Sequence, residues 1–411
     1  MSEEIPYTDE RVDLAPRRVM MLNATEENQP AMASLDLAQR SQRIEEKVLQ
    51  AQAAMRASLP YQASESVKQT LESYYQSLSS WKLHYDFDLW EQAEAYLEQI
   101  WHQLRSALCL AMECGLYEEV KAVFLEARHL LQKSGFVKDR IWLASWLRSE
   151  AARRDDWPIQ HLMTASLVWS YTSCGYYQDL DKASALWTEL IPFLAEVGAP
   201  TDDNVYREYL RDRQDVYPYN ELLVDLYETG TRIALRCARF EEARDYAEKG
   251  KAEILGLESS GLLSPRIEER FKIAFRYHEG VIYYLLGHYA IAQAIFREAV
   301  ERGSLIAWTR LVRGAKSWLA TIAIELEEYP LCERILREIT TTHSPMADKR
   351  DAICHLIRAQ LSDKLGEDSA KVASEKEAEA VLKHCSKERD SETARCYDFN
   401  RLRLQPMLCV F

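Results

Sequence analysis

Glycine and proline are scarce in this chain, with 13 Gly and 12 Pro among 411 residues. Few residues therefore interrupt long helical stretches. The 10 Trp, 22 Tyr and 10 Phe exceed what a disordered chain carries, and 47% apolar residues can bury a sizeable core. The composition predicts a folded protein whose disorder is confined to its ends.

Long apolar runs and cysteine pairs are also lacking. No segment reaches the roughly 18 uncharged apolar residues of a membrane-spanning helix, and the acidic start MSEEIPYTDERVD lacks the apolar core of a signal peptide. The nine cysteines form no CxxC pair, so we expect free thiols that pack as small apolar side chains. These absences predict a cytoplasmic protein that does not bind membranes.

Basic side chains are fewer than acidic ones. The chain has 51 basic and 65 acidic side chains, which gives a formal net charge of -14. A surface of this sign repels phosphate backbones. We therefore do not expect nucleic acid as a partner.

The apolar residues that are present recur at helical spacing, and no stretch shows the strict alternation of an antiparallel strand. The predicted fold class is all-α. The pattern divides the chain into a flexible arm at 1–33, an N-terminal helical bundle at 34–100, a repeat region at 101–341, a capping helix at 342–366, and a charged C-terminal helix or tail at 367–411.

One spacing pattern recurs within the repeat region. Its best copy consists of Gly280, Tyr283, Gly287, Tyr289, Ala292, Phe296 and Ala299. A second copy consists of Gly115, Tyr117, Val120, Phe124 and Ala127, and degenerate copies begin at Leu180, Phe240 and Tyr329. A small residue at a helix crossing lets two backbones approach, and the large residue four positions later fills the adjacent hole.

These residues resemble the motif of the tetratricopeptide (TPR) repeat family. The resemblance implies a right-handed TPR-like solenoid behind the N-terminal bundle. The turn positions at 117, 180, 240, 289 and 329 lie 63, 60, 49 and 40 residues apart, whereas the family repeat is about 34 residues, so longer or additional helices must fill the gaps. Such degenerate, long-period repeats are also similar to the helical sensor regions of bacterial signal-transduction ATPases.

Motifs that carry catalytic chemistry are missing. Gly250-Lys251 lacks the remainder of a phosphate-binding loop, His278-Glu279 lacks the second histidine of a zinc-protease motif, and no GxSxG occurs. We therefore predict no catalytic residue, no metal site and no small-molecule cofactor.

Binding of a protein or peptide is the leading functional hypothesis. In repeats of this family the first helix of each pair lines the concave face. The residues that resemble groove positions and suit an interface are Arg105, Trp169, Arg232, Tyr277, Tyr284 and Trp318. Each aromatic side chain has an alternative role in filling space between helices.

We expect a non-catalytic scaffold, adaptor or regulatory subunit that holds its partner on the concave face. Two alternatives stay open. One is a peptide-gated regulator, in which the bundle is held or released by the repeats. The other is an enzyme whose site is assembled from residues distant in sequence.

Overall fold

The computed structural model describes residues 61–82, 89–133, 136–173, 177–198, 205–212, 219–261, 265–341 and 349–386. Within these ranges the chain is helical and contains no strand, which confirms the all-α prediction. None of the described helices combines the length and the apolar character that crossing a bilayer requires. The predicted arm at 1–33, residues 34–60 of the predicted bundle and the end of the tail beyond residue 386 lie outside the described residues.

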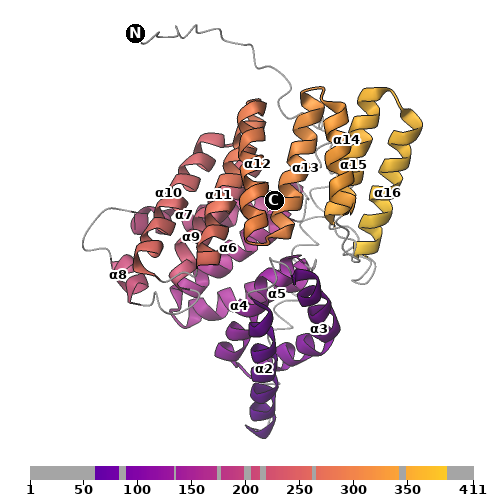
Figure 1. The fold of residues 1–411 in the computed structure, drawn as a ribbon. Coiled ribbons are helices and arrows are strands. Elements are labelled where there is room, and N and C mark those ends of the chain that lie inside the picture. The colour runs from indigo at the N-terminus through magenta and orange to yellow at the C-terminus, as the bar shows by residue number, and fades with distance from the viewer. Residues whose placement is uncertain are drawn as a thin grey trace, which may run out of the picture. The chain divides into compact units, whose positions relative to one another are not determined.

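The helices follow one another with short connections (Figure 1). They are α2 (Tyr61–Lys82), α3 (Trp90–Glu113), α4 (Tyr117–Lys133), α5 (Val137–Arg153), α6 (Trp157–Ser173), α7 (Tyr177–Gly198), α8 (Val205–Arg211), α9 (Leu222–Arg236), α10 (Phe240–Ser260), α11 (Pro265–Leu285), α12 (Tyr289–Leu305), α13 (Thr309–Glu325), α14 (Tyr329–Thr341), α15 (Lys349–Leu365) and α16 (Asp368–Ser386). A short 3₁₀ helix, Tyr219–Glu221, precedes α9.

The helix starts agree with the repeat pattern. The aromatic residues of four copies are each the first residue of a helix: Tyr117 of α4, Phe240 of α10, Tyr289 of α12 and Tyr329 of α14. The copy at Leu180 lies inside the first turn of α7. The aromatic residue therefore marks the point where the chain leaves a turn.

The turns themselves share one backbone geometry. A residue with φ between 56° and 80° ends the preceding helix at Gly115, Asp155, Ala238, Gly287, Ala307, Glu327 and Gly366. The next residue donates its N–H to the carbonyl five positions earlier, as in His288 to Tyr283 at 2.9 Å and Trp308 to Gly303 at 2.8 Å. This is the Schellman arrangement, which satisfies carbonyls that the helix end leaves open.

Consecutive helices pack against one another from α4 to α7 and from α9 to α16. Non-consecutive helices also touch, for example α6 with α9, α9 with α11, and α13 with α15. At the N-terminal end, α2, α3 and α4 contact one another, so the predicted boundary at residue 100 falls inside the continuous helix α3.

Small residues let the helices approach closely. A Cβ added to Gly230 of α9 would lie 2.6 Å from the Trp187 ring of α7, and one on Gly280 of α11 would lie 3.1 Å from the Phe296 ring of α12. Gly250 of α10 faces the Phe275 ring in the same way. One continuous apolar core results, extending from Leu71 to Leu361.

An arginine-lined pocket as the candidate binding site

Arg105 is the most exposed of the predicted groove residues. Its side chain, 54% exposed, forms an ion pair with Asp139 of α5 at 2.9 Å and lies over the Trp142 ring. The same carboxylate accepts a hydrogen bond from Trp101 Nε1 at 2.7 Å. Arg105 thus helps to fix α3 against α5.

Tyr277, Tyr284 and Trp318 pack together between α11, α12 and α13. Trp318 is 0% and Tyr277 8% exposed, and the Trp318 Nε1–H donates to the Tyr277 hydroxyl at 2.8 Å. Half-buried Tyr284 contacts the Trp318 ring at 4.9 Å, and Phe296 stacks on that ring at 5.5 Å. In this conformation Tyr277 and Trp318 fill the space between helices, the alternative that the sequence left open for aromatic side chains.

Trp169 and Arg232 lie together at a different place. The Arg232 guanidinium of α9 sits 4.0 Å from the centroid of the Trp169 ring of α6, within the range of a cation–π contact. Arg232 is 5% exposed and Trp169 is half-buried. The structure therefore brings together two of the six predicted residues at the edge of a pocket.

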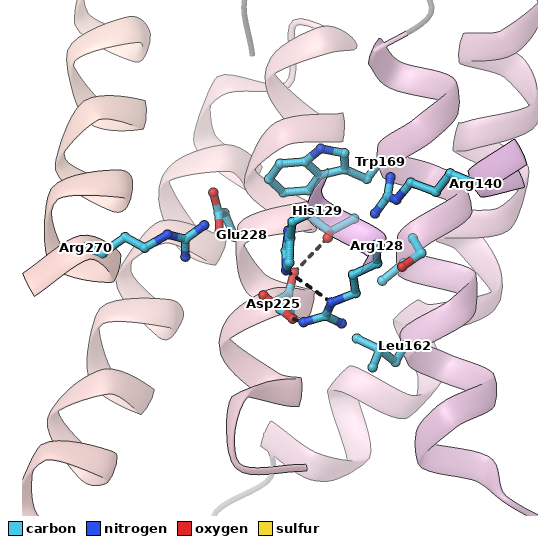
Figure 2. Close-up of a pocket in the computed structure, with 11 residues that line it drawn as sticks. Arg128, His129, Arg140, Leu162, Trp169, Asp225, Glu228 and Arg270 are labelled. Atoms are coloured by element: carbon cyan, nitrogen blue, oxygen red, sulfur yellow. Dashed lines mark hydrogen bonds and ion pairs between the residues drawn. The ribbon is translucent and has the colours of Figure 1, made fainter. Parts of the chain in front are cut away.

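Five helices contribute to this pocket. Its lining residues are Arg128 and His129 of α4; Arg140 of α5; Leu162, Ala165, Ser166 and Trp169 of α6; Asp225, Glu228 and Thr229 of α9; and Arg270 of α11. The cavity itself has a volume of about 30 Å³, and it opens to solvent. Figure 2 shows Arg140 and Arg270 approaching from opposite sides, with the Trp169 ring at one edge.

A buried ion pair forms one wall. Arg128 is 1% exposed; its Nη2 contacts Asp225 Oδ2 at 2.7 Å and its Nε donates to His129 Nε2 at 3.1 Å. Burial raises the pKa of Asp225, and neighbouring Glu228 adds to the rise, whereas Arg128 opposes it. This contact joins α4 to α9 across the base of the pocket.

Arg140 and its partner form a second wall. Arg140 is 3% exposed, and its Nη1 donates to Ser170 Oγ at 2.7 Å. The Ser170 hydroxyl in turn donates to the Ser166 carbonyl at 2.8 Å, one turn earlier on α6. These bonds restrict the rotamers that the buried guanidinium can adopt.

Glu228 faces Arg232 of α9 and both Arg270 and His278 of α11. His278 Nε2 lies 3.5 Å from Glu228 Oε1. Burial works against ionisation of this carboxyl, but His278, Arg270 and Arg232 outweigh burial and hold the pKa of Glu228 below its usual range. Glu228 is therefore a carboxylate at neutral pH.

The pocket is positive although the chain is acidic. Three arginines line it against two carboxylates, and Arg232 adds a fourth guanidinium over Trp169. The whole chain carries a formal charge of -14. A recess with this balance attracts an anionic group.

Sequence reasoning missed Arg128, Arg140 and Arg270. It searched the first helices of the repeat pairs, whereas Arg128 and Arg140 lie on α4 and α5; Arg270 lies on the first helix α11 but outside the positions taken for the groove. A signal was present at Arg128, which lies on the apolar face of α4 between Phe124 and Leu131. A charged residue on such a face is rarely buried without a partner.

No group of three or more His, Cys, Asp or Glu side chains in the described part of the chain could hold a metal ion. No protein-family model matches the chain, and no curated protein matches it.

Proposed function

We propose that this chain is a non-catalytic scaffold, adaptor or regulatory subunit that holds a protein or peptide partner. In this proposal the helix pairs form a right-handed, TPR-like solenoid, and the first helices of the pairs provide its inner face. The contacts of α6 with α9, α9 with α11, and α13 with α15 support the arrangement.

The pocket that Trp169 lines, with Arg232 over the Trp169 ring, carries the proposal. Tryptophan and arginine are the side chains most enriched among residues that dominate binding energy. Here they adjoin an open recess to which helices distant in sequence contribute, so the site depends on the packed array.

We further propose that the protein works in the cytoplasm. The buried thiol of Cys332 and the half-buried ones of Cys109 and Cys237 are free and suit a reducing compartment.

An array of synthetic peptides with random sequences tests the proposed function. The wild-type protein should bind a subset of the peptides, and Trp169→Ala should lose most of that subset. Trp81→Ala is the matched control, because Trp81 lies on α2, outside the pocket, and stacks on Tyr96. Thermal unfolding would establish that all three proteins are folded.

Two results would contradict the proposal. The first is a wild-type protein that captures no peptide. The second is equal capture by Trp169→Ala and by the wild type, which would remove the pocket from the binding surface.

A further inference from the structure

The orientation of the two outer arginines suggests what the pocket receives. Arg140 of α5 and Arg270 of α11 enter the recess from opposite sides (Figure 2). Arg140 is held by Ser170, and the Arg270 guanidinium lies over the Trp308 ring at 5.2 Å. A guanidinium presents a planar set of N–H donors that matches the oxygens of a carboxylate or phosphate.

The charge balance selects among anions. Asp225 already contacts Arg128, and Glu228 faces His278 and Arg270. The three lining arginines exceed these two carboxylates by one positive charge, and Arg232 over the Trp169 ring adds another. A carboxylate carries one negative charge, whereas a phosphate near two charges would meet stronger repulsion from Asp225 and Glu228 in a partly buried site.

We infer that the pocket binds one aspartate or glutamate side chain of the partner, held between Arg140 and Arg270 at the edge of Trp169. This inference rests on the proposed function and names the chemistry that the partner must present. The acidic side chain enters at the centre of the bound segment, and Trp169 covers the adjacent apolar part of that segment.

A purely structural role for the arginines makes a different prediction. If they served only to join α4, α5, α6, α9 and α11, replacing one would lower stability without changing which peptides bind. Selectivity between an acidic side chain and its neutral isostere therefore separates the two roles.

The test uses three pools of nonapeptides with random flanks and a fixed central residue, which is Glu, Gln or phosphoserine. The full-length protein should bind the Glu pool about tenfold more tightly than the Gln pool, the size of one charge-assisted hydrogen-bonded pair. Arg270→Gln should reduce that preference to less than about twofold.

Matched variants separate the loss of a specific contact from the general effect of removing a positive charge. Arg244→Gln on α10 makes the same charge change at an exposed site, where its ion pair with Glu241 is within one helix, and it should keep the tenfold preference. Arg140→Lys retains the positive charge but removes the planar set of guanidinium N–H donors, and it should give an intermediate preference for the Glu pool. Because Arg270 is only half-buried, Arg270→Gln should fold.

Each outcome decides a different point. Equal binding of the Glu and Gln pools would overturn the inference and leave the proposed function standing. Preference for the phosphoserine pool would overturn the choice of a carboxylate. Failure to bind any pool would overturn the proposed function and the inference with it.

Discussion

Arg310 of α13 forms a buried ion pair with Glu94 of α3, with Nη2 and Oε2 2.7 Å apart, although 216 residues separate them in sequence. Their side chains are 2% and 9% exposed. Three residues further along α13, Arg313 pairs with Asp351 of α15 at 2.6 Å. Two ion pairs therefore connect helix α13 to α3, which comes early in the chain, and to α15, which comes late.

Replacing Glu94 with Gln should weaken the attachment of α3. A buried guanidinium that loses its carboxylate costs about 3–5 kcal/mol. In Glu94→Gln, hydrogen exchange should become faster than in the wild type, and the increase should be larger in α3 and α13 than in α10. Mass spectrometry on the native protein measures these rates. The apolar double variant Glu94→Leu, Arg310→Met should restore most of the protection.

Arg105→Gln is the control, because Arg105 belongs to an exposed ion pair, and this substitution should lower the free energy of unfolding by less than about 1 kcal/mol. Equal effects of Glu94→Gln and Arg105→Gln would refute the prediction.

Two glycines of α10 should respond oppositely to alanine. The added Cβ at Gly250 would overlap the Phe275 ring, so Gly250→Ala should lower the free energy of unfolding by about 1–3 kcal/mol. A Cβ added at Gly256 would meet no other atom within 4 Å, so Gly256→Ala should raise the free energy of unfolding by about 0.5–1 kcal/mol through helix propensity. Urea unfolding followed by circular dichroism measures both, and a loss of stability at both sites would count against this packing.

Tyr277→Phe should destabilise the fold without affecting partner binding. It removes the acceptor of the buried Trp318 Nε1–H, which costs about 1–3 kcal/mol. Tyr283→Phe, at a half-buried residue on the same helix, is the matched control and should change the unfolding temperature little. If Tyr277→Phe instead kept its stability and lost peptide capture, Tyr277 would belong to the binding surface.

Acid should destabilise the packing around His161. Burial, with a contribution from Arg148, lowers the pKa of His161 from 6.5 to about 4, and its ring stacks on Phe193 at 4.0 Å. The unfolded chain therefore takes up a proton on His161 before the folded chain does. Stability from this residue is fully present above about pH 6.5 and falls as the pH drops towards about 4.

His161→Phe keeps the ring stacking and removes the titration. Its unfolding temperature should fall less than that of the wild type between about pH 6.5 and pH 4. His102→Phe is the control because His102 is exposed on α3. Parallel pH profiles for His161→Phe and the wild type would show that this histidine does not contribute.

Much of the helical layout could be predicted from the sequence. The start of α12 at Tyr289 and of α14 at Tyr329 follows from an aromatic residue ahead of an apolar repeat, a signal that depends only on nearby residues.

The candidate site could be predicted only in part. Trp169 and Arg232 were found because they lie on first helices of pairs, but helical spacing cannot tell a groove face from the face towards a paired helix. Trp318 and Tyr277 occupy the latter. Arg140 and Arg270 belong together only through the path of the intervening helices, which no local pattern records.

The uniform turns have a consequence for how this chain can change over evolution. Asp155, Ala238, Ala307 and Glu327 hold the same left-handed position that glycine holds in the other turns of this type. A side chain there costs roughly 1–2 kcal/mol, which the surrounding packing sustains. Substitutions can therefore erase the glycine signature of a turn while its backbone persists, so that sequence similarity fades faster than architecture.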